Sequence, residues 1–164
     1  MSDWRTEIED CVYDFLTVAA LARDPISRAE IDIEFLPAPH VPPSRIPPGA
    51  RAVYGFCYDG IWLKIGKAAP KANSRYTSQH YNVESSSYNL SRSLMADSTM
   101  VTIVGSDPTS IGNWIKDSTS RVNILLPATR RPELQCLLET FLHVRLRPRY
   151  EGHAQPPIAR VHHR

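Results

Sequence analysis

The sequence has few cysteines and no long apolar run. Its three cysteines, Cys11, Cys57 and Cys136, lie far apart and show no CxxC spacing, which argues against a disulfide framework or a zinc motif. Each is interpreted as a small buried apolar residue. No apolar stretch approaches the roughly 20 residues of a membrane-spanning helix, and the longest, Phe15 to Ala22, follows an acidic start where a secretory signal would be basic. We therefore expect a cytoplasmic protein without a membrane segment.

The charge is unevenly distributed along the chain. The 164 residues fit one compact domain with an extension. Residues 1–50 hold 4 Lys+Arg and 9 Asp+Glu, giving −5, whereas residues 51–164 hold 15 and 8, giving +7. A basic domain can bind phosphate backbones through counterion release, although charge alone describes a solvated surface equally well.

The first 50 residues predict an ordered acidic extension with a proline-rich connector. Apolar residues at three- and four-residue steps indicate a helix from about Asp3 to Ala22, and alternation at Ile31 to Phe35 indicates a strand. Six prolines between Pro37 and Pro48 then mark a boundary. This extension would dock on its own chain or on a partner subunit. Residues 51–152 would form the main domain, and residues 153–164 a loosely held tail.

A β-hairpin is predicted around Asp59 and Gly60, which separate two β-rich runs. A two-residue loop pairs Tyr54 with Ile65 and turns Lys64 to the opposite face. A three-residue loop from Tyr58 to Gly60 pairs Tyr54 with Lys64. We prefer the three-residue loop because it separates an aliphatic face (Val53, Cys57, Ile61, Leu63 and Ile65) from a second face (Tyr54, Phe56, Trp62 and Lys64).

Later segments complete an α+β pattern. The sequence predicts a short helix beginning near Asn73 or Ser74, helices at Leu90 to Ala96 and around Ile111 to Lys116, a third strand at Arg121 to Leu126, and a helix that begins at Pro132 and ends by Pro148.

Five pieces of the main domain form a recognisable order. They are Ala52-Val53-Tyr54, Lys64-Ile65-Gly66-Lys67, Arg75, Leu138-Glu139 through Leu142, and Pro148-Arg149-Tyr150. Together they resemble the GIY-YIG nuclease superfamily. The stretch from Arg75 through Ser78-Gln79-His80-Tyr81-Asn82 further looks like a restriction-type subgroup. The resemblance implies a three-stranded sheet flanked by helices, with the signature tripeptides on the first two strands and the glutamate on a later helix.

Three positions depart from the family pattern. The first tripeptide is Ala-Val-Tyr where the family often has Gly-Ile-Tyr, and its Tyr54 is retained. In the second tripeptide Lys64 replaces the usual tyrosine. The family's late asparagine falls on Glu151.

The resemblance implies a role for each matching residue. Glu139 would hold one Mg²⁺ or Mn²⁺ ion, which keeps most of its waters and binds the substrate phosphate. Arg75 would brace the scissile phosphate with its guanidinium fork. Tyr54 would orient or deprotonate the attacking water, with Lys64 beside it favouring the phenolate. Alternatively, Lys64 would stabilise the phosphate while His80 takes the proton.

Basic residues of the main domain are candidate contacts to the nucleic-acid backbone, namely Lys67, Lys71, Arg145, Arg147 and Arg149. The expected function is a metal-dependent endonuclease that cuts DNA in restriction or defence, with homodimerisation as one way to cut both strands. The alternative is a nucleic-acid-binding module that keeps the fold without catalysis.

Overall fold

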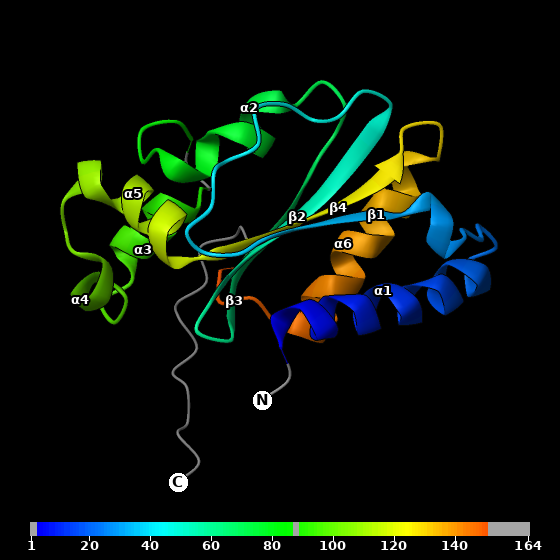
Figure 1. Ribbon diagram of the computed structural model, residues 1–164, viewed down its shortest axis with the longest axis horizontal. Coiled ribbons are helices and arrows are strands. Elements are labelled where there is room, and N and C mark those ends of the chain that lie inside the picture. The colour runs from blue at the N-terminus through cyan, green and yellow to red at the C-terminus, as the bar shows by residue number, and fades with distance from the viewer. Residues whose placement is uncertain (1–2, 87–88, 151–164) are drawn as a thin grey trace, which may run out of the picture.

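The computed structural model describes residues 3–86 and 89–150 (Figure 1). Its elements follow in the order α1 (Trp4–Leu21), the 3₁₀ helix η1 (Arg28–Glu30), β1 (Asp32–Leu36), β2 (Ala50–Tyr58), β3 (Ile61–Ala68), α2 (Asn73–Thr77), the 3₁₀ helix η2 (Gln79–Tyr81), α3 (Leu90–Ala96), α4 (Val101–Val104), α5 (Pro108–Ser118), β4 (Ser120–Pro127) and α6 (Pro132–Leu146). No helix within the described ranges is both long and apolar enough to cross a membrane.

The sheet is antiparallel and has four strands in the order β1-β4-β2-β3. The predicted α+β class is confirmed, but the expected count of three strands is wrong. The additional strand is β1, which the sequence predicted within the N-terminal extension and which pairs with β4 along its whole length. β4 and β2 are consequently interior strands, and β3 is an edge.

Two hydrophobic cores lie on opposite faces of this sheet (Figure 1). α1 and α6 cover one face, where Phe15 and Leu138 belong to the same buried cluster as Val53. α2, α3, α4 and α5 cover the other, where Leu94 and Phe56 are buried together. Removing apolar surface from water on both sides is the main stabilising contribution to such a layered fold.

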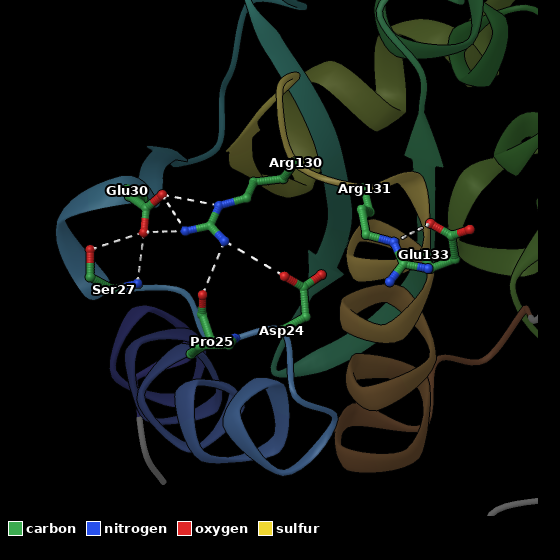
Figure 2. Close-up of polar contacts among 7 residues, drawn as sticks. All are labelled: Asp24, Pro25, Ser27, Glu30, Arg130, Arg131 and Glu133. Carbon is green, nitrogen blue, oxygen red and sulfur yellow. Dashed lines mark hydrogen bonds and ion pairs between the residues drawn. The ribbon is translucent and has the colours of Figure 1, made fainter.

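The N-terminal segment docks on its own chain. Figure 2 shows Arg130, in the turn between β4 and α6, reaching the segment that joins α1 to β1. Its guanidinium donates to both carboxylate oxygens of Glu30, with the shortest distance 2.6 Å, and to the carbonyl of Pro25 at 3.0 Å. It also forms an ion pair with Asp24 at 3.6 Å. Of the two docking alternatives for the extension, the structure therefore has the one within the chain.

The predicted helices are present, and their first residues explain where they begin. The Asp3 carboxylate accepts from the backbone N–H of Arg5 at the start of α1, and Asp107 caps α5 in the same way ahead of Pro108. α4 was not predicted. The expectation that all cysteines are buried is wrong for Cys136, which is exposed on α6, because it lies on the side of that helix away from the sheet.

The turn between β2 and β3 has two residues, not the three that we predicted. Asp59 and Gly60 have φ values of 48° and 73°, and Tyr58 pairs with Ile61 across them. Positive φ at both central residues defines a type I′ turn, whose twist matches that of the flanking strands.

A β-bulge in β3 then shifts the register two residues beyond the turn. Cys57 pairs with Trp62, but Phe56 pairs with Lys64, so Leu63 is an extra residue on β3. A bulge of this kind interrupts the alternation of side chains between the two faces. Leu63 accordingly joins the cluster that contains Phe56, which corrects its predicted position on the aliphatic face.

The bulge also decides what lies opposite Tyr54. Its partner is Gly66, so both predicted pairings, with Lys64 and with Ile65, are wrong. Lys64 nevertheless lies on the Tyr54 face, because the extra residue compensates for the shorter turn. Trp62 was predicted on that face but packs on the other, where its indole N–H donates to Glu7 of α1 at 2.9 Å.

Candidate active site

An open cavity of about 400 Å³ lies where β3 ends and α2 begins. Its lining includes Lys67 from the end of β3, Arg75 from α2 and Gln135 from α6. α6 covers one face of the sheet and α2 the other, so the cavity lies at the edge where the two layers meet. An edge strand allows side chains from both faces to converge in this way.

Tyr54 and His80 form a buried pair beside this region. Tyr54 is 2% exposed in the middle of β2, and His80 is 3% exposed in η2. The Tyr54 Oη and the His80 Nε2 are 2.6 Å apart. The structure thus brings together two residues that the sequence predicted as site residues.

The direction of this hydrogen bond follows from the second ring nitrogen of His80. The backbone N–H of Leu90, at the start of α3, donates to Nδ1 at 3.2 Å. Since a backbone N–H is always a donor, Nδ1 is unprotonated and the neutral ring carries its proton on Nε2. His80 therefore donates to the Tyr54 oxygen, and neither ring nitrogen has a free lone pair.

Burial and nearby cations determine the charge states of this pair. Burial, followed by the charges of Lys64, Arg121 and Arg75, holds the pKa of His80 well below its usual range, so the ring stays neutral. Burial raises the pKa of Tyr54, and Arg121 and Arg75 oppose that rise. In this state Tyr54 is a protonated phenol that accepts a hydrogen bond.

Gly66 makes room for the Tyr54 ring. A Cβ at Gly66 would lie 2.7 Å from the Tyr54 hydroxyl oxygen and 2.8 Å from Cζ. The ring is buried and hydrogen-bonded, so it cannot move aside without leaving His80. The glycine in the Lys-Ile-Gly string thus has a steric role, which the sequence did not reveal.

We expect Gly66→Ala to displace the Tyr54 hydroxyl and to lower the DNA cleavage that the resemblance implies by about 10²-fold, the effect of misplacing a reacting group by about 1 Å. Cleavage rates and thermal unfolding measure this change. In a Tyr54→Phe background, Gly66→Ala should cause no further loss of cleavage, because the displaced hydroxyl is already absent. An equal loss in both backgrounds would contradict the steric account.

Lys64 is buried on the face of Tyr54, with 5% of its surface exposed. It forms no ion pair within the described part of the chain. Burial and the Arg75 charge lower the pKa of Lys64 to about 8, against an opposing effect of Glu139. A lysine with such a pKa exchanges a proton close to neutral pH, which suits both charge stabilisation and proton transfer.

Glu139 lies on α6, with its side chain 19% exposed, and is paired with Lys67 of β3. One turn earlier, Gln135 donates both of its amide hydrogens to the carbonyls of Ala52 and Ala68, at 2.9 and 3.0 Å. This fixes the amide of Gln135, which lines the cavity. Glu139 is close enough to affect the pKa values of both Lys64 and Tyr54.

The oxygen donors here fit a hydrated Mg²⁺ or Mn²⁺ ion better than a metal fully enclosed by protein. Over residues 3–86 and 89–150 there is no group of three or more His, Cys, Asp or Glu side chains that could hold a metal. Mg²⁺ commonly binds through one or two carboxylates and substrate phosphates while keeping several waters. Glu139 beside the cavity can serve as such a carboxylate, provided that Lys67 releases it.

The other predicted backbone contacts lie in different surroundings. Lys71 is exposed between the cavity-lining residues Ala69 and Ala72. Arg145, Arg147 and Arg149 do not line the cavity. Arg145 pairs with Asp14 of α1 at 2.6 Å. Arg147 is the left-handed C-cap of α6. Arg149 pairs with buried Asp97 at 2.6 Å.

Two of the predictions concern parts of the chain that the structure does not describe. Glu151, where the family has its late asparagine, and the predicted tail at residues 153–164 both lie outside the described residues.

Sequence reasoning missed two polar residues of this region, Gln135 and Arg121. Gln135 could have been found, because it lies four residues before Glu139 and so on the same helical face. Arg121 is fully buried beside Tyr54. The sequence gives a weaker indication that Arg121 belongs to the site, because a polar residue alternating with Val122 usually indicates the solvent side of a strand.

Comparison of the chain with protein-family models, with curated proteins and with solved structures found no match.

Proposed function

We propose that this chain is a cytoplasmic, divalent-metal-dependent endonuclease of the GIY-YIG type that hydrolyses phosphodiester bonds in DNA. The observation that supports the proposal is the closeness of residues that are far apart in the sequence but match the superfamily's order. Arg75 and Lys67 line the open cavity at the sheet edge. Tyr54, Lys64, His80 and Glu139 do not line it, but they interact with Arg75, with Lys67 or with one another. Such a set of perturbed and interacting ionisable groups beside a cavity is typical of active sites.

Arg75 would bind the scissile phosphate. Its side chain lines the cavity, and its charge acts on Tyr54, Lys64 and His80 alike. A guanidinium fork matches two phosphate oxygens and stabilises the charge that develops on them.

Glu139 would hold the metal ion, which when bound supplies a Lewis acid for the phosphate and lowers the pKa of its waters. Lys67 would then be free to contact the DNA backbone. Its contact with Glu139 orients the carboxylate before an ion binds.

Lys64, which lies on the same face and has a pKa of about 8, would in its neutral form take the Tyr54 hydroxyl proton, and the resulting phenolate would orient the attacking water and accept its proton. The charge of the metal ion would add to those of Arg121 and Arg75, which oppose the effect of burial on Tyr54. Of the two mechanisms implied by the resemblance, this arrangement favours Tyr54 as the base. His80 already uses both ring nitrogens, one toward Leu90 and one toward Tyr54.

A second candidate is a nucleic-acid-binding module without catalysis. The observation that favours it is the Lys67–Glu139 pair, in which a lysine that lines the cavity already binds the proposed metal carboxylate. A role in restriction or defence and action as a homodimer are further parts of the nuclease proposal, and they rest on the resemblance alone.

The test incubates purified full-length protein with supercoiled plasmid and with single-stranded DNA, in Mg²⁺, Mn²⁺ or EDTA. The nuclease proposal expects cleavage with metal and none with EDTA. Cleavage that persists in EDTA would contradict the metal role. Salt-dependent binding without cleavage under every condition would instead establish the binding module.

A further inference from the structure

Arg121 is a fully buried cation in the central strand β4. Its exposed fraction is 0%, and it is among the largest of the fully buried side chains. Arg121 lies opposite Phe56 in the pairing of β4 with β2, two residues from the Tyr54–Asn123 pair. Its side chain therefore shares the sheet face of Tyr54.

Aromatic rings surround the Arg121 guanidinium. Its central carbon lies 5.2 Å from the ring centroid of Tyr54, 5.1 Å from that of Phe56 and 4.9 Å from that of Tyr76. Distances below about 6 Å allow a cation–π attraction, which is strongest where water is excluded.

Neutral groups satisfy the guanidinium hydrogens. Arg121 donates to the carbonyl of Tyr76 at 2.6 Å, to the Asn123 side-chain oxygen at 2.8 Å and to the Tyr81 hydroxyl at 3.0 Å. Asn123 in turn donates to Glu34 at 3.0 Å. Within the described residues Arg121 forms no ion pair with a carboxylate, so its positive charge is not neutralised directly.

Burial of an unpaired charge is costly, and an apolar side chain of similar volume would avoid that cost. The hydrogen bonds lower the cost without cancelling the charge. The charge therefore has its main effect on the groups around it, of which Tyr54 and His80 belong to the candidate site.

We infer that Arg121 is a positioning residue of the candidate active site, which holds the Tyr54 ring against His80 and so maintains the hydrogen bond between them. The contribution of Arg121 to catalysis rests on the proposed nuclease function. Its effect on the Tyr54–His80 pair does not depend on that function.

The groups facing His80 agree with this role. They are Tyr54 from β2, Lys64 from β3, Arg75 from α2, Arg121 from β4 and the Leu90 N–H from α3. All the charged ones are cations, and each holds the His80 pKa down. A protonated ring would need to donate from Nδ1 and would lose the Leu90 contact. Arg121 is the one of these cations that also touches the Tyr54 ring.

The test compares Arg121→Met and Arg121→Gln, which remove the charge, with Arg121→Lys, which keeps it. NMR titration of labelled histidines, with His80→Gln to assign the signal, reports the protonation of His80. In both neutral variants the titration midpoint should rise above its wild-type value, while burial and the charges of Lys64 and Arg75 still hold it below the ordinary value of about 6.5. In the lysine variant it should remain low. The two neutral variants guard against the failure of one of them to fold.

The cleavage profile supplies a second readout. In the neutral variants the acidic limb should move to higher pH together with the His80 midpoint, and the plateau rate should fall about 10-fold as the ring contact is lost. Lysine should restore the acidic limb. The matched control is Arg130→Met, the same change at the arginine of Figure 2, which should lower stability without moving either pH value.

A His80 midpoint that stays at its wild-type value in a folded Arg121→Met or Arg121→Gln protein would overturn the inference and leave Arg121 as a structural residue. If wild-type protein cleaves no DNA, the nuclease proposal fails, while the NMR titration still decides the role of Arg121.

Discussion

Replacing Glu139 with alanine is expected to lower DNA cleavage by roughly 10³-fold or more, because the site then loses its metal carboxylate and several kcal/mol of charge stabilisation. Plasmid cleavage measures the rate, and electron paramagnetic resonance of Mn²⁺ measures metal binding without reference to activity. The fold should persist. The Lys67–Glu139 pair is partly exposed, and exposed ion pairs contribute only about 0–1 kcal/mol to the free energy of unfolding.

Glu133→Ala is the matched control for this substitution. Glu133 lies in the first turn of the same helix and forms an exposed pair with Arg131 at 3.6 Å, as Figure 2 shows. It should leave both cleavage and Mn²⁺ binding unchanged. Wild-type cleavage in the Glu139→Ala protein would remove the metal from the proposed mechanism.

Tyr54→Phe should lower cleavage by about 10²- to 10⁴-fold, the usual contribution of a positioned acid–base group. The substitution removes one oxygen and leaves the His80 Nε2–H without its acceptor. An unsatisfied buried donor costs about 1–3 kcal/mol, so the free energy of unfolding should fall by that amount. Cleavage rates at saturating metal and chemical denaturation measure the two effects separately.

Tyr150→Phe controls for the loss of a buried hydroxyl. Tyr150 donates to Asp97 at 2.7 Å, in a cluster that does not line the cavity. It should cost stability while leaving cleavage within a few-fold of wild type, since the substitution removes only the hydroxyl and leaves the backbone bridge between Tyr150 and Lys64 in place. Should Tyr54→Phe cut DNA as fast as wild type, Lys64, with its pKa of about 8, becomes the proton acceptor.

Local signals in the sequence predicted most of the secondary structure. A proline at the first helical position marks the start of α6, and alternating apolar residues mark β1 and β4. These signals depend on neighbouring residues alone. The docking of β1 on β4 is a contact between distant segments, which no local pattern reveals, and so the strand count was wrong.

The candidate site was harder to predict because it depends on register and burial. Lys64 lies on the Tyr54 face because the two-residue turn is combined with a bulge. The amino-acid composition of β3 does not predict that bulge. The burial of Arg121 gives no local signal, because a polar residue that alternates with apolar ones usually indicates the solvent side of a strand. In the structure β4 is an interior strand with helices on both sides, and the polar side chains of its second face are buried.

The bulge at Leu63 also sets how many residues separate the turn from Lys64. Deleting Leu63 would leave a hairpin of ordinary pairing, in which Lys64 still pairs with Phe56 and stays on the Tyr54 face. A related chain without this residue would therefore keep the same active-site face with one residue fewer between the turn and the lysine. A gapless alignment of two such hairpins would then match residues that point to opposite sides of the sheet.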